Sequence, residues 1–356
     1  MSSEFSLLRQ EVDRGILGEN EGLPIGFPRL NKFVRLNKRI YTLVFGPSGS
    51  GKSAFVHNAF ILNPFDFIRS KANKRNIRMK VFLFSMERSK VLTLAKWVSR
   101  KIFLDHGVLI PIAKLLGWWE NKINDTERAY FEMYEDYIDE LMNMVEIIEG
   151  PQNPTGIYKV LKRYALSHGT EEVIDEFTKI YHPNDPNEVV IPIFDHHGLV
   201  KVESKMNKKE AIDKLSEYAQ WSRDYLGYAP VDVAQLTRGL NNPLYSKQES
   251  FEPTIDDVKE SGRPAEDCDQ LLSIFEPLRY RTKNLSYDAD QFVSENGERH
   301  FRSISILKNS YGESDINIGM GMQGATGFFK ELPKPSNMSS FSYQSIMDGS
   351  YFLPTI

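Results

Sequence analysis

Short apolar runs alternate with helical patterns along most of the chain. The runs are rich in β-branched and aromatic residues, which is typical of buried strands. They occupy residues 40–45, 80–84, 145–148, 189–194, 231–234, 271–275, 304–307 and 316–318. Helical spacing separates most of them, notably at residues 54–62, 89–103, 153–168 and 208–225. This alternation predicts an α/β fold with a mostly parallel central sheet and helices on both faces.

The pattern divides the chain into an N-terminal arm (1–22), a central domain (23–332) and a tail (333–356). In the arm, apolar residues recur three and four apart, which predicts a helix with one apolar stripe. The stripe packs either on its own domain or on a neighbouring subunit, and the sequence leaves both open. Acidic, aromatic residues 117–143 predict a helical insertion, and residues 169–188 a second insertion ending in turn chemistry. The serine- and proline-rich tail is expected to be flexible.

Composition narrows the class of protein. Hydrophobic residues make up 41% and charged residues 26% of the 356, which excludes wholesale disorder. The single cysteine, Cys268, excludes an intrachain disulfide and a multi-cysteine zinc site. No apolar run approaches the roughly 20 residues of a membrane helix, and no signal-peptide pattern is present, so we expect a cytoplasmic protein without membrane contact. The net charge of −4 argues against a chain that coats nucleic acid but permits a local basic strip.

The strongest chemical signal follows the first apolar run. The sequence there matches G-x-x-x-x-G-K-[ST] in full, with Gly46, Pro47, Ser48, Gly49, Ser50, Gly51, Lys52 and Ser53. A buried strand before it and a helix after it are the context of a phosphate-binding P-loop. Glycines let main-chain N–H groups point at phosphates, Lys52 would reach the β- and γ-phosphates, and Ser53 would ligate Mg²⁺. The sequence therefore predicts a site for a nucleoside triphosphate with Mg²⁺.

Polar residues at the ends of further apolar runs could complete such a site. Asp195 directly follows one run, where a P-loop protein needs a carboxylate for its metal, whereas Asp185 and Asp213 end no run and are poorer candidates. Glu87 follows the second run and could activate the attacking water, or could only interact with a helix start. Gln235 ends a third run and could contact a γ-phosphate, or could be an ordinary surface amide.

Together these pieces resemble one family, the DnaB-type hexameric replicative helicases, whose motor domain has the RecA fold. The likeness covers about residues 23–332 in chain order. Besides the P-loop, it is carried by GLPIGF (22–27), FSMERS (84–89), QLTR (235–238), DVKESG (257–262) and ILKN (306–309). The ordered set is specific, although each short motif after the P-loop is weak. A RecA-like P-loop NTPase that binds ATP and Mg²⁺ is what the resemblance implies.

The resemblance also implies roles for single residues. Glu87 matches the family's catalytic base, Asp195 its metal-binding aspartate, and Gln235 the glutamine that senses the γ-phosphate. Arg238 is placed at the nucleotide, and Lys308 would supply a positive charge to the neighbouring subunit's site. We therefore expect Lys52, Glu87, Gln235 and Lys308 to be catalytic, and Ser53 and Asp195 to hold the metal.

The sequence departs from the family in two respects. The family's bulky N-terminal domain, which docks primase, is expected to be absent, as in short phage-encoded members. In the family an arginine finger follows the Lys-Asn pair, but here that position is Ser310. Because such a finger is worth roughly 10³–10⁵ in rate, either Lys308 alone or another arginine such as Arg302 acts in trans, or hydrolysis is slow.

Nucleic-acid contacts are expected along the channel of a ring. By resemblance they come from the loop after Asp195 and from the DVKESG segment, and the candidates are Lys201, Lys205, Lys208, Lys259, Glu260 and Gly262. Such lysines would neutralise phosphates without reading bases, although a solvated surface explains any single lysine equally simply. The basic stretch 69–80 is either a solvated loop or an outer contact with DNA or a partner.

The lead hypothesis is an ATP-driven 5′→3′ replicative DNA helicase that works as a hexameric ring on single-stranded DNA. A primase or a loader would be a further partner, and a phage-encoded protein would act in the bacterial host cytoplasm. The alternatives are a RecA-like recombination ATPase that forms filaments, and a non-motor NTP-binding loader or assembly protein. The adjacent His196 and His197 favour packing or loop roles over a zinc site.

Overall fold

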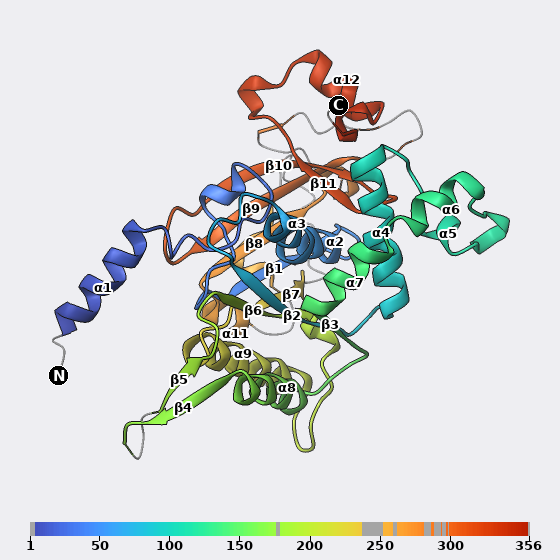
Figure 1. The fold of residues 1–356 in the computed structure, drawn as a ribbon. Coiled ribbons are helices and arrows are strands. Elements are labelled where there is room, and N and C mark those ends of the chain that lie inside the picture. Colours follow the sequence, from blue (N-terminus) through green and yellow to red (C-terminus); the bar gives the residue numbers. More distant parts are fainter. Residues whose placement is uncertain are drawn as a thin grey trace.

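One central sheet of nine strands runs through the described residues of the computed structural model (Figure 1). The structure describes residues 4–175, 179–236, 252–258, 262–280, 286, 287, 293, 297 and 299–354. The strand order is β11-β10-β9-β8-β1-β7-β6-β2-β3. The bounds are β1 (Thr42–Gly46), β2 (Arg78–Ser85), β3 (Val145–Glu149), β6 (Glu188–Asp195), β7 (Val231–Gln235), β8 (Gln270–Phe275), β9 (Phe301–Asn309), β10 (Ile316–Gln323) and β11 (Phe328–Glu331). Every run predicted as a strand lies in this sheet, and β11 is an addition.

The sheet has a parallel part and an antiparallel part. Strands β8, β1, β7, β6, β2 and β3 run parallel, so their carboxyl ends meet at one edge. Strand β9 pairs antiparallel with β8, β10 with β9, and β11 with β10. The prediction of a mostly parallel sheet is confirmed. Because β9 reverses direction, it begins near the carboxyl edge of the parallel strands and ends at their amino edge.

Helices cover both faces of the sheet, as the alternation predicts (Figure 1). Successive side chains of a strand point to opposite faces, so Val44 packs in one core cluster while Leu43 and Phe45 pack in the other. The Val44 face carries α2 (Lys52–His57), α3 (Asn63–Arg69), α4 (Lys90–His106) and α7 (Glu135–Met144). The opposite face carries α8 (Pro154–Ser167), α9 (Lys208–Asp224) and α11 (Arg263–Asp267). A π turn (Asn58–Leu62) joins α2 to α3.

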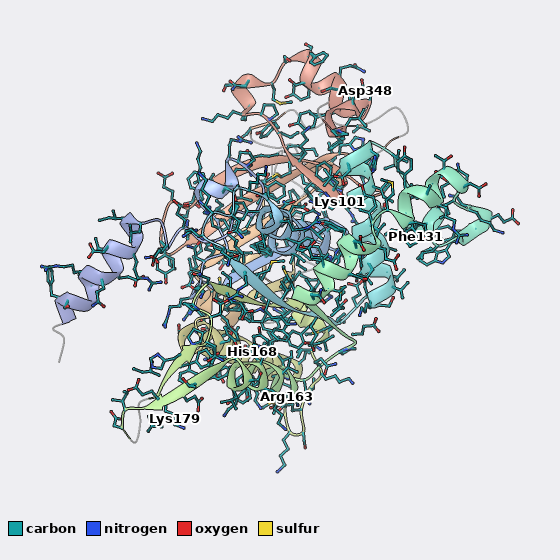
Figure 2. The ribbon with its side chains drawn as sticks, in the orientation of Figure 1. Lys101, Phe131, Arg163, His168, Lys179 and Asp348 are labelled. Carbon is teal, nitrogen blue, oxygen red and sulfur yellow. The ribbon has the colours of Figure 1, made fainter. Side chains whose placement is uncertain are left out.

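Both predicted insertions have secondary structure of their own. Residues 117–143 contain α6 (Asp125–Glu132) and most of α7, next to the short α5 (Ile112–Leu115), so the expected helical insertion is present. Tyr137 of α7 packs edge-on against Phe65 of α3 with ring centroids 5.2 Å apart, which ties the insertion to the core. Residues 169–188 contain the antiparallel pair β4 (Gly169–Val173) and β5 (Lys179–Pro183). Figure 2 shows Phe131 on α6 and Lys179 on the β4–β5 pair, both at the periphery.

The two ends of the chain differ from what the patterns predict. The expected flexible tail is wrong for residues 333–354, which form 3-10 turns and α12 (Ser340–Met347). Ile346 and Phe352 are 0% and 1% exposed and pack with Phe103 and Phe328. Sparse apolar residues suffice to anchor this tail although its overall composition is polar.

The N-terminal helix α1 (Glu4–Ile16) projects away from the sheet (Figure 1). Its apolar residues Phe5, Leu8, Val12 and Ile16 are between 53% and 78% exposed. Packing of this stripe on its own domain is therefore excluded for the residues that the structure describes, and docking on another subunit stays a prediction. No helix of the described ranges is long and apolar enough to cross a membrane.

Candidate nucleotide-binding site

The P-loop, Gly46 to Ser53, lies at the carboxyl edge of the sheet between β1 and α2. A Cβ atom on Gly46 would lie 2.2 Å from the main-chain oxygen of Ile274 in β8, so no larger residue fits there. Gly49 and Gly51 have φ angles of 78° and 97°, in the left-handed region that favours glycine. The glycines thus allow the tight curl that brings main-chain N–H groups into a phosphate cradle.

Two arginines tether the loop from within its own chain. Arg302 Nε donates to the main-chain oxygen of Ser50 at 2.9 Å, and Arg279 Nη1 donates to that of Ser48 at 2.6 Å. Arg302 also pairs with the buried carboxylate of Glu276 at 3.3 Å, and burial lowers the pKa of its guanidinium to about 10. The suggestion that Arg302 acts in trans is therefore wrong, because β9 buries this residue against its own P-loop. The sequence offered no sign of the Arg279 contact.

Lys52 begins α2 and holds its amine inside the loop. Its Nζ donates to the main-chain oxygens of Gly46 at 2.9 Å and Pro47 at 2.8 Å. Burial lowers the pKa of Lys52 to about 8, and the charges of Asp195 and Glu87 oppose this shift. These carboxylates therefore lie close enough to affect the lysine, so the structure gathers all three predicted residues at one edge.

Ser53 and Asp195 form the pair that could hold a metal ion. Ser53 Oγ donates to Asp195 Oδ1 at 3.0 Å, which joins the first turn of α2 to the end of β6. Asp195 is 6% exposed, and burial raises its pKa to about 6, while the Ser53 hydrogen bond opposes the shift. A hydroxyl and a carboxylate are oxygen ligands of the kind Mg²⁺ prefers, and a cation would offset the burial of the ionised carboxylate. The residues present therefore fit Mg²⁺.

Glu87 and Gln235 follow from neighbouring strands. Ser85 is in register with Asp195, so Glu87, two residues past the end of β2, lies at the same edge and is exposed. Gln235 ends β7 in register with Gly46, and its Nε2 lies 3.2 Å from His196 Nε2. The strand register therefore brings Glu87 and Gln235 to the same edge of the sheet as the P-loop, as predicted.

The two histidines after Asp195 make different contacts. Burial lowers the pKa of His196 to about 4, and the ring contacts Gln235. His197 Nδ1 lies 2.6 Å from Asp232 Oδ2, and the Tyr41 hydroxyl donates to the same oxygen at 3.3 Å. His197 is therefore buried and contacts β7 through Asp232.

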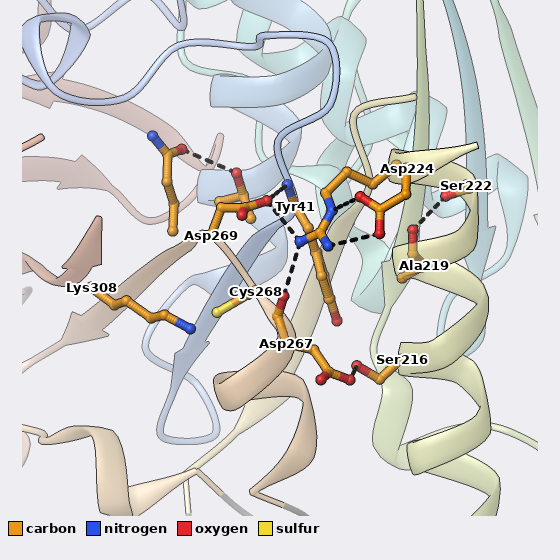
Figure 3. Close-up of polar contacts among 12 residues, drawn as sticks. Tyr41, Ser216, Ala219, Ser222, Asp224, Asp267, Cys268, Asp269 and Lys308 are labelled. Atoms are coloured by element: carbon orange, nitrogen blue, oxygen red, sulfur yellow. Dashed lines mark hydrogen bonds and ion pairs between the residues drawn. The ribbon is translucent and has the colours of Figure 1, made fainter. Parts of the chain in front are cut away.

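Lys308 lies far from its own P-loop. In the antiparallel β8–β9 pair it faces Leu271, and Leu271 in turn lies beside Leu43 near the start of β1. Its Nζ donates to the main-chain oxygens of Ala265 at 3.1 Å and Glu266 at 2.6 Å. Figure 3 shows Lys308 on the side of the sheet that carries Cys268 and Asp269. Any role of Lys308 at a phosphate therefore belongs to a neighbouring subunit's site.

The predicted DNA-contacting residues are only partly within the described ranges. Lys259 and Glu260 lie outside the described residues, as does Arg238, which is predicted to contact the nucleotide. Lys201 and Lys205 are exposed on the loop after β6, whereas Lys208 Nζ donates to the main-chain oxygen of Val200 at 2.6 Å. Gly262 precedes the first residue of α11.

The basic stretch 69–80 lies apart from the P-loop edge, since it leads into the start of β2. Arg69 pairs with Glu140 at 2.7 Å, and Arg78 pairs with Asp185. Asp185 is thereby occupied away from the phosphates. Whether this stretch meets DNA or only solvent stays a prediction.

Comparisons with known proteins give a partial sequence relative and similar solved structures. No protein-family model matches the chain. The replication factor C large subunit of Methanococcus vannielii is 27% identical over 159 residues, which is 41% of this chain and 31% of that protein. The chain therefore spans under a third of the length of this curated relative.

Two solved structures are similar over most of the chain. The ATPase domain of a phage helicase matches with a TM-score of 0.67 and 16% identity, covering 94% of this chain and 100% of that chain. A DnaB-like replicative helicase, described with its interactions with primase, matches with a TM-score of 0.63 and 16% identity, covering 94% of this chain and 67% of that chain. At this identity the likeness shows the fold. The chain has the RecA-like α/β fold of these two structures, with a P-loop after its first strand, as the motifs predict.

Proposed function

We propose that this chain is the ATP-hydrolysing motor of a replicative DNA helicase that moves along single-stranded DNA. The observation that carries the proposal is the meeting of Lys52, Ser53, Asp195, Glu87 and Gln235 at one sheet edge. Open α/β sheets bind ligands at this carboxyl edge. The likeness of the fold to helicase ATPase domains supports the choice of reaction.

Each residue has a separate task in the proposed hydrolysis. The P-loop N–H groups bind the phosphates, and Lys52 neutralises charge on the β- and γ-phosphate oxygens. Mg²⁺, held by Ser53 and Asp195, supplies further positive charge at those oxygens when it is bound. Glu87 accepts a proton from the attacking water, for which its exposed position at the P-loop edge of the sheet is suitable. Gln235 orients the γ-phosphate, and its contact with His196 links the γ-phosphate to the loop after β6.

The catalytic site is completed between subunits in this proposal. Lys308 is about one strand length from its own P-loop, so it serves the neighbour's site, and a closed hexameric ring satisfies every subunit in this way. Single-stranded DNA passes along the loop after β6, where Lys201, Lys205 and Lys208 neutralise phosphates. Lys259, Glu260 and Gly262 of the DVKESG segment are proposed as further DNA contacts, and Arg238 as a contact to the nucleotide. Primase or a loader would be a further partner, in the bacterial cytoplasm if the protein is phage-encoded.

The decisive measurement is ATP turnover with and without single-stranded DNA, alongside the mass of the assembly. Lys52→Ala and Glu87→Ala should abolish turnover, while Lys122→Ala, at an exposed lysine of the insertion 117–143, should leave it unchanged. Binding of ATP without turnover on DNA would refute the motor. Filaments in place of rings under electron microscopy would favour a recombination ATPase.

A mixing experiment tests the shared site. Lys52→Ala and Lys308→Ala subunits are each expected to be inactive alone. Mixed in equal amounts and assembled at random, they should regain about a quarter of wild-type turnover, because one interface in four combines an intact Lys52 with a neighbour's intact Lys308. No recovery would contradict the shared site. Ser310→Arg should raise turnover if Lys308 alone is a poor substitute for an arginine finger.

A loader is the second candidate function. It is supported by the likeness to the replication factor C large subunit over 41% of this chain. A loader would hydrolyse ATP while placing another ring on DNA and would not unwind a duplex by itself. Strand displacement from a forked DNA substrate by the purified protein therefore separates the two candidates.

A further inference from the structure

His57 is one helical turn beyond Ser53 on α2, so the two side chains lie on the same face of the helix. Both approach the same carboxylate. Ser53 Oγ lies 3.0 Å from Asp195 Oδ1, and His57 Nε2 lies 3.7 Å from Asp195 Oδ2. Each carboxylate oxygen of Asp195, the proposed metal ligand, therefore lies near one of these two residues of α2. None of the sequence motifs includes this histidine.

Trp97 decides which nitrogen of His57 carries the proton. Its indole Nε1 lies 3.2 Å from His57 Nδ1, across an edge-on contact of the two rings. An indole N–H only donates hydrogen bonds, so His57 Nδ1 must accept and cannot carry a proton. The proton of the neutral ring then lies on Nε2, which faces Asp195. The ring orientation is also fixed, because both residues are buried.

The surroundings of His57 leave Asp195 as the acceptor for this proton. His57 Nε2 is buried and has no hydrogen-bond partner within 3.5 Å among the described residues. A closure of under about 1 Å would bring Nε2 and Asp195 Oδ2 into ordinary hydrogen-bond range.

We propose that His57 is a positioning residue that holds Asp195 Oδ2, so that Asp195 Oδ1 and the Ser53 hydroxyl are presented together to the metal ion. The proposal rests on the nucleotide-binding role proposed above for the P-loop. A partner of this kind behind a metal-binding carboxylate limits its rotation, and removal of such a partner typically weakens metal affinity by about 10–100-fold.

The test measures how much Mg²⁺ strengthens nucleotide binding, without any turnover. The affinity of the full chain for the fluorescent nucleotide mant-ADP is measured in excess EDTA and in excess Mg²⁺, and the ratio reports the metal. His57→Leu should reduce that ratio by about 10-fold or more and leave the EDTA affinity unchanged. His57→Gln, whose amide can still donate, should retain most of the ratio. His182→Leu is the matched control, because His182 also contacts a carboxylate, Glu172 at 2.9 Å, but on the exposed β4–β5 pair.

A double variant separates positioning from folding. His57→Leu leaves the buried Trp97 N–H without an acceptor and should lower the melting temperature. His57→Leu combined with Trp97→Phe removes both partners and should restore much of the stability while the Mg²⁺ ratio stays low. Recovery of the ratio together with stability would overturn the proposal, as would a wild-type ratio in His57→Leu. NMR of ¹⁵N-histidine should show His57 as the Nε2–H tautomer, and the Nδ1–H tautomer would also overturn it. If the wild-type chain does not bind mant-ADP at all, the proposed function fails first.

Discussion

Replacement of Arg302 by methionine tests whether the P-loop is held from within its own subunit. Methionine keeps much of the aliphatic volume of the buried stem but removes the guanidinium. That group donates to the main-chain oxygens of Ser50 at 2.9 Å and Phe301 at 2.7 Å, and it pairs with Glu276 at 3.3 Å. Glu276 is 3% exposed, so the change removes one of the partners of a buried carboxylate.

The size of the effect follows from these contacts. Loss of one partner of a buried ion pair costs about 3–5 kcal/mol when the remaining charge is left alone. Glu276 keeps Arg299 at 2.6 Å, which is partly exposed, so we expect a smaller loss of about 2–3 kcal/mol in unfolding free energy. The freed Ser50 carbonyl also loosens the phosphate cradle. One lost hydrogen bond of about 1–1.5 kcal/mol corresponds to roughly tenfold weaker nucleotide binding.

Three measurements check these expectations for Arg302→Met. Thermal or urea unfolding should show the loss of stability, and titration with mant-ADP should show the loss of affinity. In an equal mixture with Lys52→Ala subunits, no site of wild-type nucleotide affinity should appear, because every subunit with an intact Lys52 carries the loosened cradle. Wild-type affinity in about a quarter of the sites would mean that Arg302 serves the neighbour. Wild-type stability together with wild-type affinity would refute the tether.

Three further changes probe the edge of the sheet and the tail. Asp195→Asn should raise the melting temperature of the nucleotide-free protein at pH 7.5 but not near pH 4. The pKa of Asp195 is 3.8 in the unfolded chain and about 6 in the folded one, so its ionisation destabilises the fold only as pH rises above 3.8. Gly46→Ala should destabilise the fold and abolish nucleotide binding, since the added Cβ would lie 2.2 Å from a main-chain oxygen, while Gly324→Ala, with open space around it, should be tolerated. Phe352→Ala should cost about 3–5 kcal/mol in unfolding free energy by urea titration, and Phe341→Ala, which is 80% exposed, should cost little.

The parallel half of the fold was predictable because its strands are buried on both faces. Such strands are near-continuous apolar runs, and most of them end where a polar residue emerges at the carboxyl edge. Asp195 and Gln235 were found in this way, and the strand register brings both to the P-loop. The antiparallel strands β9, β10 and β11 were less predictable, because the hydrophobic pattern of a strand does not indicate its direction in the sheet. The sequence pattern did not predict strand β11 or the packing of Phe352, because each involves only a few apolar residues.

The supporting residues of the site could not be predicted from spacing. His57 lies on a helix whose apolar neighbours predict only packing, and Trp97 looks like any buried aromatic of an amphipathic helix. Their contact arises because α2 and α4 cover the same face of the sheet, 40 positions apart in the chain. Arg279 and Arg302 likewise reach the loop only after β8 and β9 pair beside β1.

Because β9 runs antiparallel to β8, this one strand reaches both the carboxyl edge and the amino edge of the parallel strands. Arg302, near its start, lies by the P-loop edge and donates to Ser50, while Lys308, near its end, lies at the opposite edge beside Leu271. Six residues of extended strand separate them by about 20 Å. In the proposed ring, a shift of β9 caused by nucleotide at one site would therefore be transmitted along a rigid element to the neighbour's site. The substitution Ile304→Ser, at a buried position near the middle of β9, should weaken this link, and cooperativity of ATP turnover should fall more than nucleotide affinity.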